Sequence, residues 1–364
     1  MARIDAFLKL GTDQGCSDIH FSVGLPPLLR MHGDLMPIKF RDLSQSELEG
    51  YLNEIITSRA HQDELRMGHD LDFSYVSSGG GRFRVNVFRK ETGIGATFRA
   101  IPQEVPTLDR LGLPAIVKKL CDQHQGMILV TGSTGTGKST TLAAMIDHLN
   151  RTRRVNIISL EDPIEFVHKS KQSQIIQREL HTHLPSFSEG VRAAMREDPD
   201  VILVGELRDA ETIRWAMTAA ETGHLVLGTL HTTGAVKTID RVVDALPADE
   251  REQTKSFLSQ GLLAVITQVL VKTADQRGRK GICEIMVVSR AIGKLIMTDQ
   301  THQIPTQLQT GKELGMQMMD QALLASVQAK EIDADDAYVY ATDKRLFARF
   351  VTDTSLLPKV DVAP

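Results

Sequence analysis

The stretch Gly132-Ser133-Thr134-Gly135-Thr136-Gly137-Lys138-Ser139 decides the fold of this 364-residue chain, and Thr140 follows it directly. It has the spacing of a phosphate-binding loop. In such a loop, glycines let successive backbone N–H groups converge on phosphate oxygens, the lysine reaches the β- and γ-phosphates, and the serine hydroxyl is a magnesium ligand. The stretch therefore predicts that residues 132–140 bind ATP and that Ser139 contacts Mg²⁺.

The sequence on either side of the loop supports this prediction. The apolar run at 127–131 is typical of a buried strand, and residues 140–149 have the pattern of a helix. A strand, a loop and a helix in this order are what a phosphate-binding loop requires. Further apolar runs at 155–160, 201–204 and 225–229 alternate with helical segments. This alternation predicts an α/β domain around a mainly parallel sheet.

The pattern before the loop predicts a separate, smaller domain. Residues 1–101 combine helical segments with short alternating strands, which indicates an α+β fold. The helices are expected near 44–57 and 58–67, and the strands at 18–23, 28–33, 71–76, 82–89 and 95–101. Pro102 and Pro106 lie in a stretch without clear period, so an interdomain linker is predicted at 102–112. The remaining residues, 113–364, form the second domain, predominantly helical after about Asp249.

Composition restricts the class of protein. The hydrophobic fraction of 41% and the charged fraction of 24% are those of a folded protein. The net charge of −4 gives no electrostatic reason to expect nucleic acid. No stretch approaches the roughly 18 uninterrupted apolar residues of a membrane span, and no signal peptide is recognisable, so a cytoplasmic protein is expected. Cys16, Cys121 and Cys283 lie far apart, which argues against a disulfide framework or a zinc site.

Two acidic clusters are candidates for the chemistry of hydrolysis. ATP hydrolysis needs one carboxylate to support magnesium and another to orient or deprotonate the attacking water. In the first cluster, at 158–165, an apolar strand runs into Glu161, Asp162 and Glu165. In the second, at 200–209, a hydrophobic strand delivers Glu206 in the manner of a Walker B motif. The alternatives are a solvated turn for the first cluster and a helix-capping group for the second.

Histidines and arginines give weaker signals. His224 and His231 flank the strand at 225–229, and a lone histidine is usually structural. His231 follows the carboxyl end of that strand, where ligands of open α/β sheets gather, so it is the better candidate for sensing the γ-phosphate. The strands before the linker are rich in arginine: Arg82, Arg84, Arg89 and Arg99. These are either a solvated basic face or arginine fingers that reach the ATP of a neighbouring subunit, and composition does not separate the two.

Taken in order, the motifs resemble those of one family, the secretion-type ATPases, and within it the PilT-like type IV pilus retraction motors. The loop at 132–140 is similar to the family's Walker A motif, and residues 158–165 to its Asp box. Residues 201–209 are similar to its Walker B motif, and residues 221–233 to its His box. Four motifs in this order are highly specific, and they extend the resemblance over nearly the whole chain.

The resemblance implies an architecture and a set of roles. The expected assembly is a homo-hexameric ring of subunits with a PAS-like N-terminal domain and a RecA-like ATPase domain. By motif position, Glu165 is the general base and Glu206 acts on magnesium and water. Arg84 and Arg99 are the implied trans contacts to phosphate, and the His box adds His224 to the nucleotide-binding residues and His231 to the catalytic ones. The implied partners are an inner-membrane pilus platform protein and a paralogous pilus ATPase, which place the protein at the inner membrane without direct insertion.

Two departures refine the expected function. Pilus extension motors are longer at the N-terminus and carry a four-cysteine insertion, and because this chain has neither, retraction is favoured. PilT-type motors also have an Ala-Ile-Arg-Asn-Leu-Ile-Arg-Glu motif, where this chain has Ala291-Ile292-Gly293-Lys294-Leu295-Ile296-Met297-Thr298. The altered motif keeps a PilU-like accessory or regulatory ATPase as the alternative. A DNA-translocating ring would need a basic pore, and the pI of about 6.3 argues against it.

Overall fold

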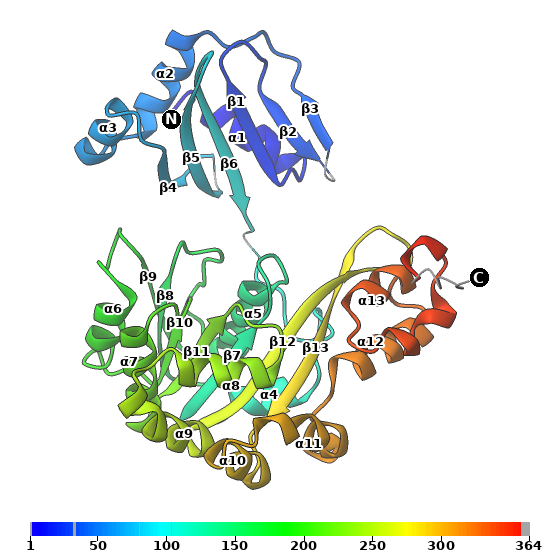
Figure 1. The fold of residues 1–364 in the computed structure, drawn as a ribbon. Helices are drawn as coiled ribbons and strands as arrows, with labels where there is room; N and C mark the ends of the chain where they lie inside the picture. Colours follow the sequence, from blue (N-terminus) through cyan, green and yellow to red (C-terminus); the bar gives the residue numbers. More distant parts are fainter. Residues whose placement is uncertain (1, 32–33, 80, 103, 358–364) are drawn as a thin grey trace. The chain divides into compact units, whose positions relative to one another are not determined.

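The computed structural model describes residues 2–31, 34–79, 81–102 and 104–357 (Figure 1). The chain divides into two compact units, Met1–Glu104 and Val105–Pro364. Both units combine helices with a sheet, so the predicted α/β class is confirmed.

The first unit is built on a sheet of six antiparallel strands in the order β3-β2-β1-β6-β5-β4. The strands are β1 (Asp18–Ser22), β2 (Leu28–Met31), β3 (Asp34–Pro37), β4 (Leu71–Val76), β5 (Arg82–Lys90) and β6 (Gly93–Ile101), and the helices are α1 (Asp5–Asp13), α2 (Gln45–Ile55) and α3 (Arg59–Arg66). Apolar residues of α1 and α2 form one core with Phe21, Phe83 and Phe98 of the sheet. Ser44 and Glu47 form a capping box at the start of α2.

The second unit is built on a sheet of seven strands in the order β13-β12-β7-β11-β10-β8-β9. The strands are β7 (Gly126–Thr131), β8 (Asn156–Glu161), β9 (Gln174–Glu179), β10 (Val201–Val204), β11 (Leu225–Leu230), β12 (Leu262–Lys272) and β13 (Arg279–Val287). Neighbouring strands are parallel except β12 and β13. The mainly parallel sheet that the apolar runs predict is therefore present.

Helices cover both faces of this sheet. They are α4 (Ile116–Cys121), α5 (Lys138–Thr152), α6 (Phe187–Ala194), α7 (Ala210–Glu221), α8 (Ala235–Asp244), α9 (Arg251–Gln260), α10 (Arg290–Met297), α11 (Ile304–Thr310), α12 (Met319–Gln328) and α13 (Ala334–Tyr340). Successive β7 residues alternate between two cores: Met127 packs with helices α6 to α11, and Ile128 packs with α4 and α5. All of β7 is buried, so the loop that follows it begins on a fixed support.

The region after Asp249 is predominantly helical, as predicted, with helices α9 to α13. It also contains two long strands that were not expected, β12 and β13, which extend the central sheet beyond β7. The run at 262–271 is apolar almost throughout, and such a run does not distinguish a buried helix from a buried strand. The run forms a strand because it pairs with both β7 and β13.

The connection between the units is shorter than the linker predicted at 102–112. Leu108 is only 3% exposed and belongs to the core that also contains Val117 and Ile128. Residues 105–112 therefore pack as part of the second unit.

Among the described residues, none of the helices has the length and hydropathy to cross a membrane. The three cysteines are free and buried. Burial raises the pKa of the Cys121 and Cys283 thiols to about 12 and also raises that of Cys16.

The altered motif at 291–298 has a packing explanation in the crossing of α9 and α10. A Cβ atom added to Gly293 would lie 2.6 Å from the backbone oxygen of Ser259, closer than real Cβ contacts allow. Any larger residue, including the arginine of the PilT motif, requires the two helices to move apart. Glycine at this position therefore permits a close helix approach.

We expect Gly293→Ala to lower the free energy of unfolding by about 1–2 kcal/mol, because overpacking against backbone outweighs the roughly 1 kcal/mol that alanine gains over glycine in a helix. Denaturant unfolding measures the change. Gly50→Ala is the matched control, since Gly50 also lies inside a helix, α2, and its added Cβ atom would meet only the flexible end of the Arg3 side chain. Equal stability of the two variants would show that α9 and α10 separate without cost.

Candidate nucleotide site

The phosphate-binding loop lies between β7 and α5, where the sequence predicts it. Gly132, Gly135 and Gly137 have φ values of 137°, 81° and 89°, which L-residues with a side chain rarely adopt. A Cβ atom on Gly132 would also lie 2.4 Å from the backbone oxygen of Gln268. Because these glycines leave the backbone bare, the loop has the form of a cradle for phosphate oxygens.

Lys138 already lies in this cradle. Its Nζ donates to the backbone oxygens of Gly132, at 2.8 Å, and Ser133, at 3.0 Å. Burial lowers the pKa of Lys138, and the negative charges of Glu206 and Glu165 act in the opposite direction. The two predicted catalytic carboxylates are therefore within electrostatic reach of the loop lysine.

Strand β12 supports the loop from the side. The buried hydroxyls of Thr131 and Thr267 are hydrogen-bonded at 2.8 Å. Thr141 donates to the Oε1 atom of buried Gln268 at 2.7 Å. Gln268 has no recognisable signal in the sequence, because a single amide in an apolar run gives no motif.

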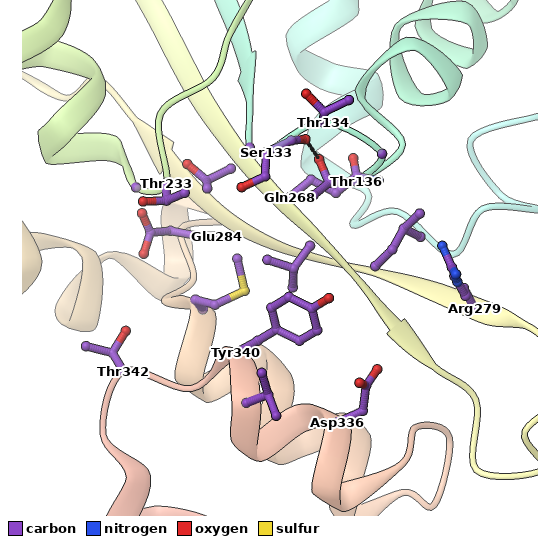
Figure 2. Close-up of a pocket in the computed structure, with 18 of the residues that line it drawn as sticks. Ser133, Thr134, Thr136, Thr233, Gln268, Arg279, Glu284, Asp336, Tyr340 and Thr342 are labelled. Carbon is purple, nitrogen blue, oxygen red and sulfur yellow. Dashed lines mark hydrogen bonds between the residues drawn. The ribbon is translucent and has the colours of Figure 1, made fainter. Parts of the chain in front are cut away.

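A cavity of about 520 Å³ borders the loop, and Figure 2 shows the side chains of Ser133, Thr134 and Thr136 along its wall. Ligand sites in proteins commonly have about 300–1,000 Å³, so the volume is that of a small-molecule site. The sequence also did not predict that the C-terminal helices contribute to this wall. The rest of the wall includes Thr233 from the loop after β11, Gln268, Arg279 and Glu284 from β12 and β13, and Asp336 and Tyr340 from α13.

Glu206 and His231 meet at the carboxyl edge of the sheet. β10 and β11 are parallel neighbours, so the residues after them lie close together. His231 Nε2 is 3.1 Å from Glu206 Oε1, and Arg208 donates to Oε2 of the same carboxylate at 2.8 Å. Burial acts to raise the pKa of Glu206, but the Arg208 hydrogen bond and nearby positive charges outweigh it and lower the pKa. Glu206 is therefore held as a carboxylate.

Glu165 lies in the loop that follows β8, the strand next to β10. It is exposed, whereas Glu161 of the same cluster is half-buried. Burial raises the pKa of Glu161, although hydrogen bonds from Gln177 and Ser159 act against this. The cluster thus separates into one carboxylate facing outward and one facing inward.

His224 is not brought to the loop. It precedes β11, and its backbone oxygen accepts from Gly126, the first residue of β7. The phosphate loop begins after Thr131, at the other end of β7, which is about 17–20 Å away for strands of this length. The Nδ1 atom of His224 lies 2.8 Å from the backbone oxygen of Ala219. This placement corrects the expectation that His224 binds nucleotide held by the loop of its own subunit.

Arg84 and Arg99 belong to the first unit and are directly opposite each other on β5 and β6. Arg99 Nε donates to Asp18 at 2.8 Å, and Arg84 Nε is 4.0 Å from Asp72. Burial acts to raise the pKa of Asp18, but hydrogen bonds from Arg99 and Ser17 outweigh it and lower the pKa. Both arginine side chains remain largely exposed, at 48% and 68%.

A glycine cradle with a buried lysine, next to carboxylates at the carboxyl ends of parallel strands, defines a P-loop ATPase. The chain belongs to the Type II/IV secretion system protein family, which matches residues 4–334. Within that family it is a PilT-like secretion ATPase.

Individual relatives agree with this assignment. The chain is 47% identical to the type IV pilus retractation ATPase PilT of Pseudomonas aeruginosa, over 92% of this chain and 96% of the relative. It is 35% identical to the type IV pilus ATPase PilU of the same organism, over 97% and 93%. A crystal structure of the pilus retraction motor PilT with bound ADP superposes with a TM-score of 0.89, at 40% identity, covering 96% of this chain and 100% of that one.

Proposed function

We propose that this protein hydrolyses ATP to ADP and phosphate and that the reaction powers the retraction of type IV pili, and hence twitching motility. The observation that carries the proposal is the glycine loop that holds Lys138, with Glu206 and His231 in contact at the carboxyl edge of the same sheet, in a chain that is 47% identical to PilT. Nucleotide binding needs only the loop. Hydrolysis needs the two carboxylates as well.

The residues at this site fit a magnesium ion. The Ser139 hydroxyl and the Glu206 carboxylate are hard oxygen donors, and Mg²⁺ is usually held by one or two such protein groups together with substrate phosphates. When bound, the ion would neutralise developing charge on the phosphates. In the proposed reaction, Lys138 binds the phosphates, Glu165 takes the proton of the attacking water, and His231 contacts the γ-phosphate from beside Glu206.

The proposed motor is a homo-hexamer in which Arg84 and Arg99 of one subunit reach the nucleotide of the next. Their adjacency on one sheet face supports this role, since two guanidinium groups side by side suit a triphosphate. Binding by groups from two subunits links the angle between the units to nucleotide occupancy, with the stretch around Pro102 as the hinge.

The proposed location is the cytoplasmic side of the inner membrane, where an inner-membrane platform protein and a paralogous pilus ATPase are the partners. A PilU-like accessory role is the second candidate function, and it is supported by the 35% identity to PilU over 97% of the chain. Deletion of the gene distinguishes them. A hyperpiliated, non-twitching strain supports autonomous retraction, and a strain that still twitches supports an accessory role.

The purified chain should hydrolyse ATP with Mg²⁺, and chelation with EDTA should reduce phosphate release by at least about 100-fold, because the metal's charge stabilisation is lost. Phosphate release with and without added MgCl₂ measures this. Restoration of the rate by excess Mg²⁺ after chelation is the control. A rate unaffected by EDTA would exclude the proposed metal-dependent hydrolysis.

A further inference from the structure

Strand β9, at the edge of the second sheet, holds the segment 161–168 in place through side-chain hydrogen bonds. This segment is here called the acidic loop. β9 pairs in parallel with β8, and this register places Gln177 opposite Ser159. The Gln177 amide nitrogen donates to Glu161 Oε1 at 3.0 Å and to the backbone oxygen of Phe166 at 2.8 Å. Its Oε1 atom accepts from the backbone N–H of His168 at 2.8 Å. One side chain therefore connects both ends of the acidic loop.

Two carboxylates, the buried Glu179 and the half-buried Glu161, hold the middle of the same loop. Glu179 of β9 accepts from the backbone N–H of Ile164 at 3.1 Å. Glu161 accepts from Ser159 Oγ at 2.7 Å and also from the backbone N–H of Glu165. The backbone on both sides of Glu165 is thus fixed, while the Glu165 side chain is exposed. Such an arrangement fixes the position of one carboxylate without burying it.

We propose that Gln177 is a positioning residue for Glu165, acting by holding the acidic loop in the conformation that presents this carboxylate to the nucleotide. The inference rests on the proposed function, in which Glu165 is the general base. Gln177 supplies the donor to the half-buried Glu161 carboxylate, and Glu161 in turn holds the N–H of Glu165. Without that donor, a half-buried carboxyl group loses a partner and the loop loses its attachments at Phe166 and His168.

The variant Gln177→Met tests the proposal, because it keeps the approximate size of the side chain and removes its hydrogen bonds. We expect kcat to fall by about 10- to 100-fold with KM for ATP changed by less than about threefold, since displacement of a reacting group affects the chemical step more than binding. Gln174→Met is the matched control, because Gln174 is exposed on the same strand. It should hydrolyse ATP at the wild-type rate.

A double-mutant cycle with Glu165→Gln separates positioning from general stabilisation. If Gln177 acts through Glu165, Gln177→Met should change the residual rate of Glu165→Gln by less than about twofold. If Gln177→Met lowers that residual rate as much as it lowers the wild-type rate, the positioning role is overturned. Wild-type kcat in Gln177→Met, with a slow Glu165→Gln, also overturns it.

Two other results of these mutant experiments would have a different meaning. If Glu165→Gln itself hydrolyses ATP at the wild-type rate, the role of Glu165 in the proposed function fails, which is distinct from failure of the Gln177 proposal. If Gln177→Met does not fold, as judged by thermal unfolding, Gln177→Glu replaces it. That variant keeps an acceptor for the His168 N–H and loses the donors to Glu161 and Phe166, so the same criteria decide the proposal.

Discussion

Replacing Glu206 with glutamine should lower the rate of ATP hydrolysis by about 10²- to 10⁴-fold, while the affinity for ATP changes by less than about threefold. Glu206 carries a negative charge that is held in place by Arg208 and His231. Glutamine keeps the shape and loses the charge that, in the proposed reaction, supports magnesium and the attacking water. The phosphate cradle at 132–139 does not include this residue, so binding should persist.

Phosphate release and the binding of a fluorescent ATP analogue measure the two quantities separately. Glu211→Gln is the matched control, because Glu211 is an exposed glutamate at the start of α7. It should be indistinguishable from the wild type in both assays. Wild-type turnover in Glu206→Gln would overturn the Walker B assignment.

Replacing Lys138 with alanine should weaken ATP binding by about 2–4 kcal/mol, which is about 30- to 1,000-fold in Kd, because hydrogen bonds from a charged group to the phosphates are lost. Turnover should fall below detection for the same reason. Isothermal titration with a non-hydrolysable ATP analogue measures the affinity. The exposed Lys119 on α4 gives the control variant Lys119→Ala, for which no change is expected.

Lys138→Ala also provides a test of the composite site. Subunits with Lys138→Ala keep their arginines, and subunits with Arg84→Ala keep their loop, so mixed rings of the proposed hexamer would contain some intact sites. Partial recovery of ATPase activity on mixing is expected. Arg89→Ala is the matched arginine control, since Arg89 is on the same strand but donates to the backbone oxygen of Leu65. Rings made only of Arg89→Ala subunits should hydrolyse ATP. Absence of recovery at every mixing ratio would make Arg84 a structural residue.

The loop and its flanking elements could be predicted from the sequence because all their information is local. A buried strand, a glycine-rich turn and a helix are consecutive, and each glycine is at a position where the backbone requires one. Glu206 and His231 could likewise be placed near each other, since each follows a strand of one parallel sheet. Their distance of 3.1 Å could not be predicted, because it depends on side-chain packing.

The residues that support the site could not be predicted, because their roles arise from pairing between distant segments. Gln268 reaches Thr141 only after β12 pairs with β7, and the sequence pattern of this region predicts mainly helices rather than β12. Gln177 is one of several glutamines in a polar stretch, and only the register of β9 on β8 places it beside Glu161. The need for glycine at position 293 likewise arises only from the contact of α10 with α9 at Ser259.

The burial of all three cysteines makes the chain well suited to site-specific labelling. The thiolate is the reactive form of cysteine, and raised pKa values together with burial keep Cys16, Cys121 and Cys283 protonated and inaccessible to maleimides. A cysteine introduced at an exposed position would therefore react first in the wild-type background. One dye in each unit would then report by energy transfer whether the two units change their separation as ATP is turned over.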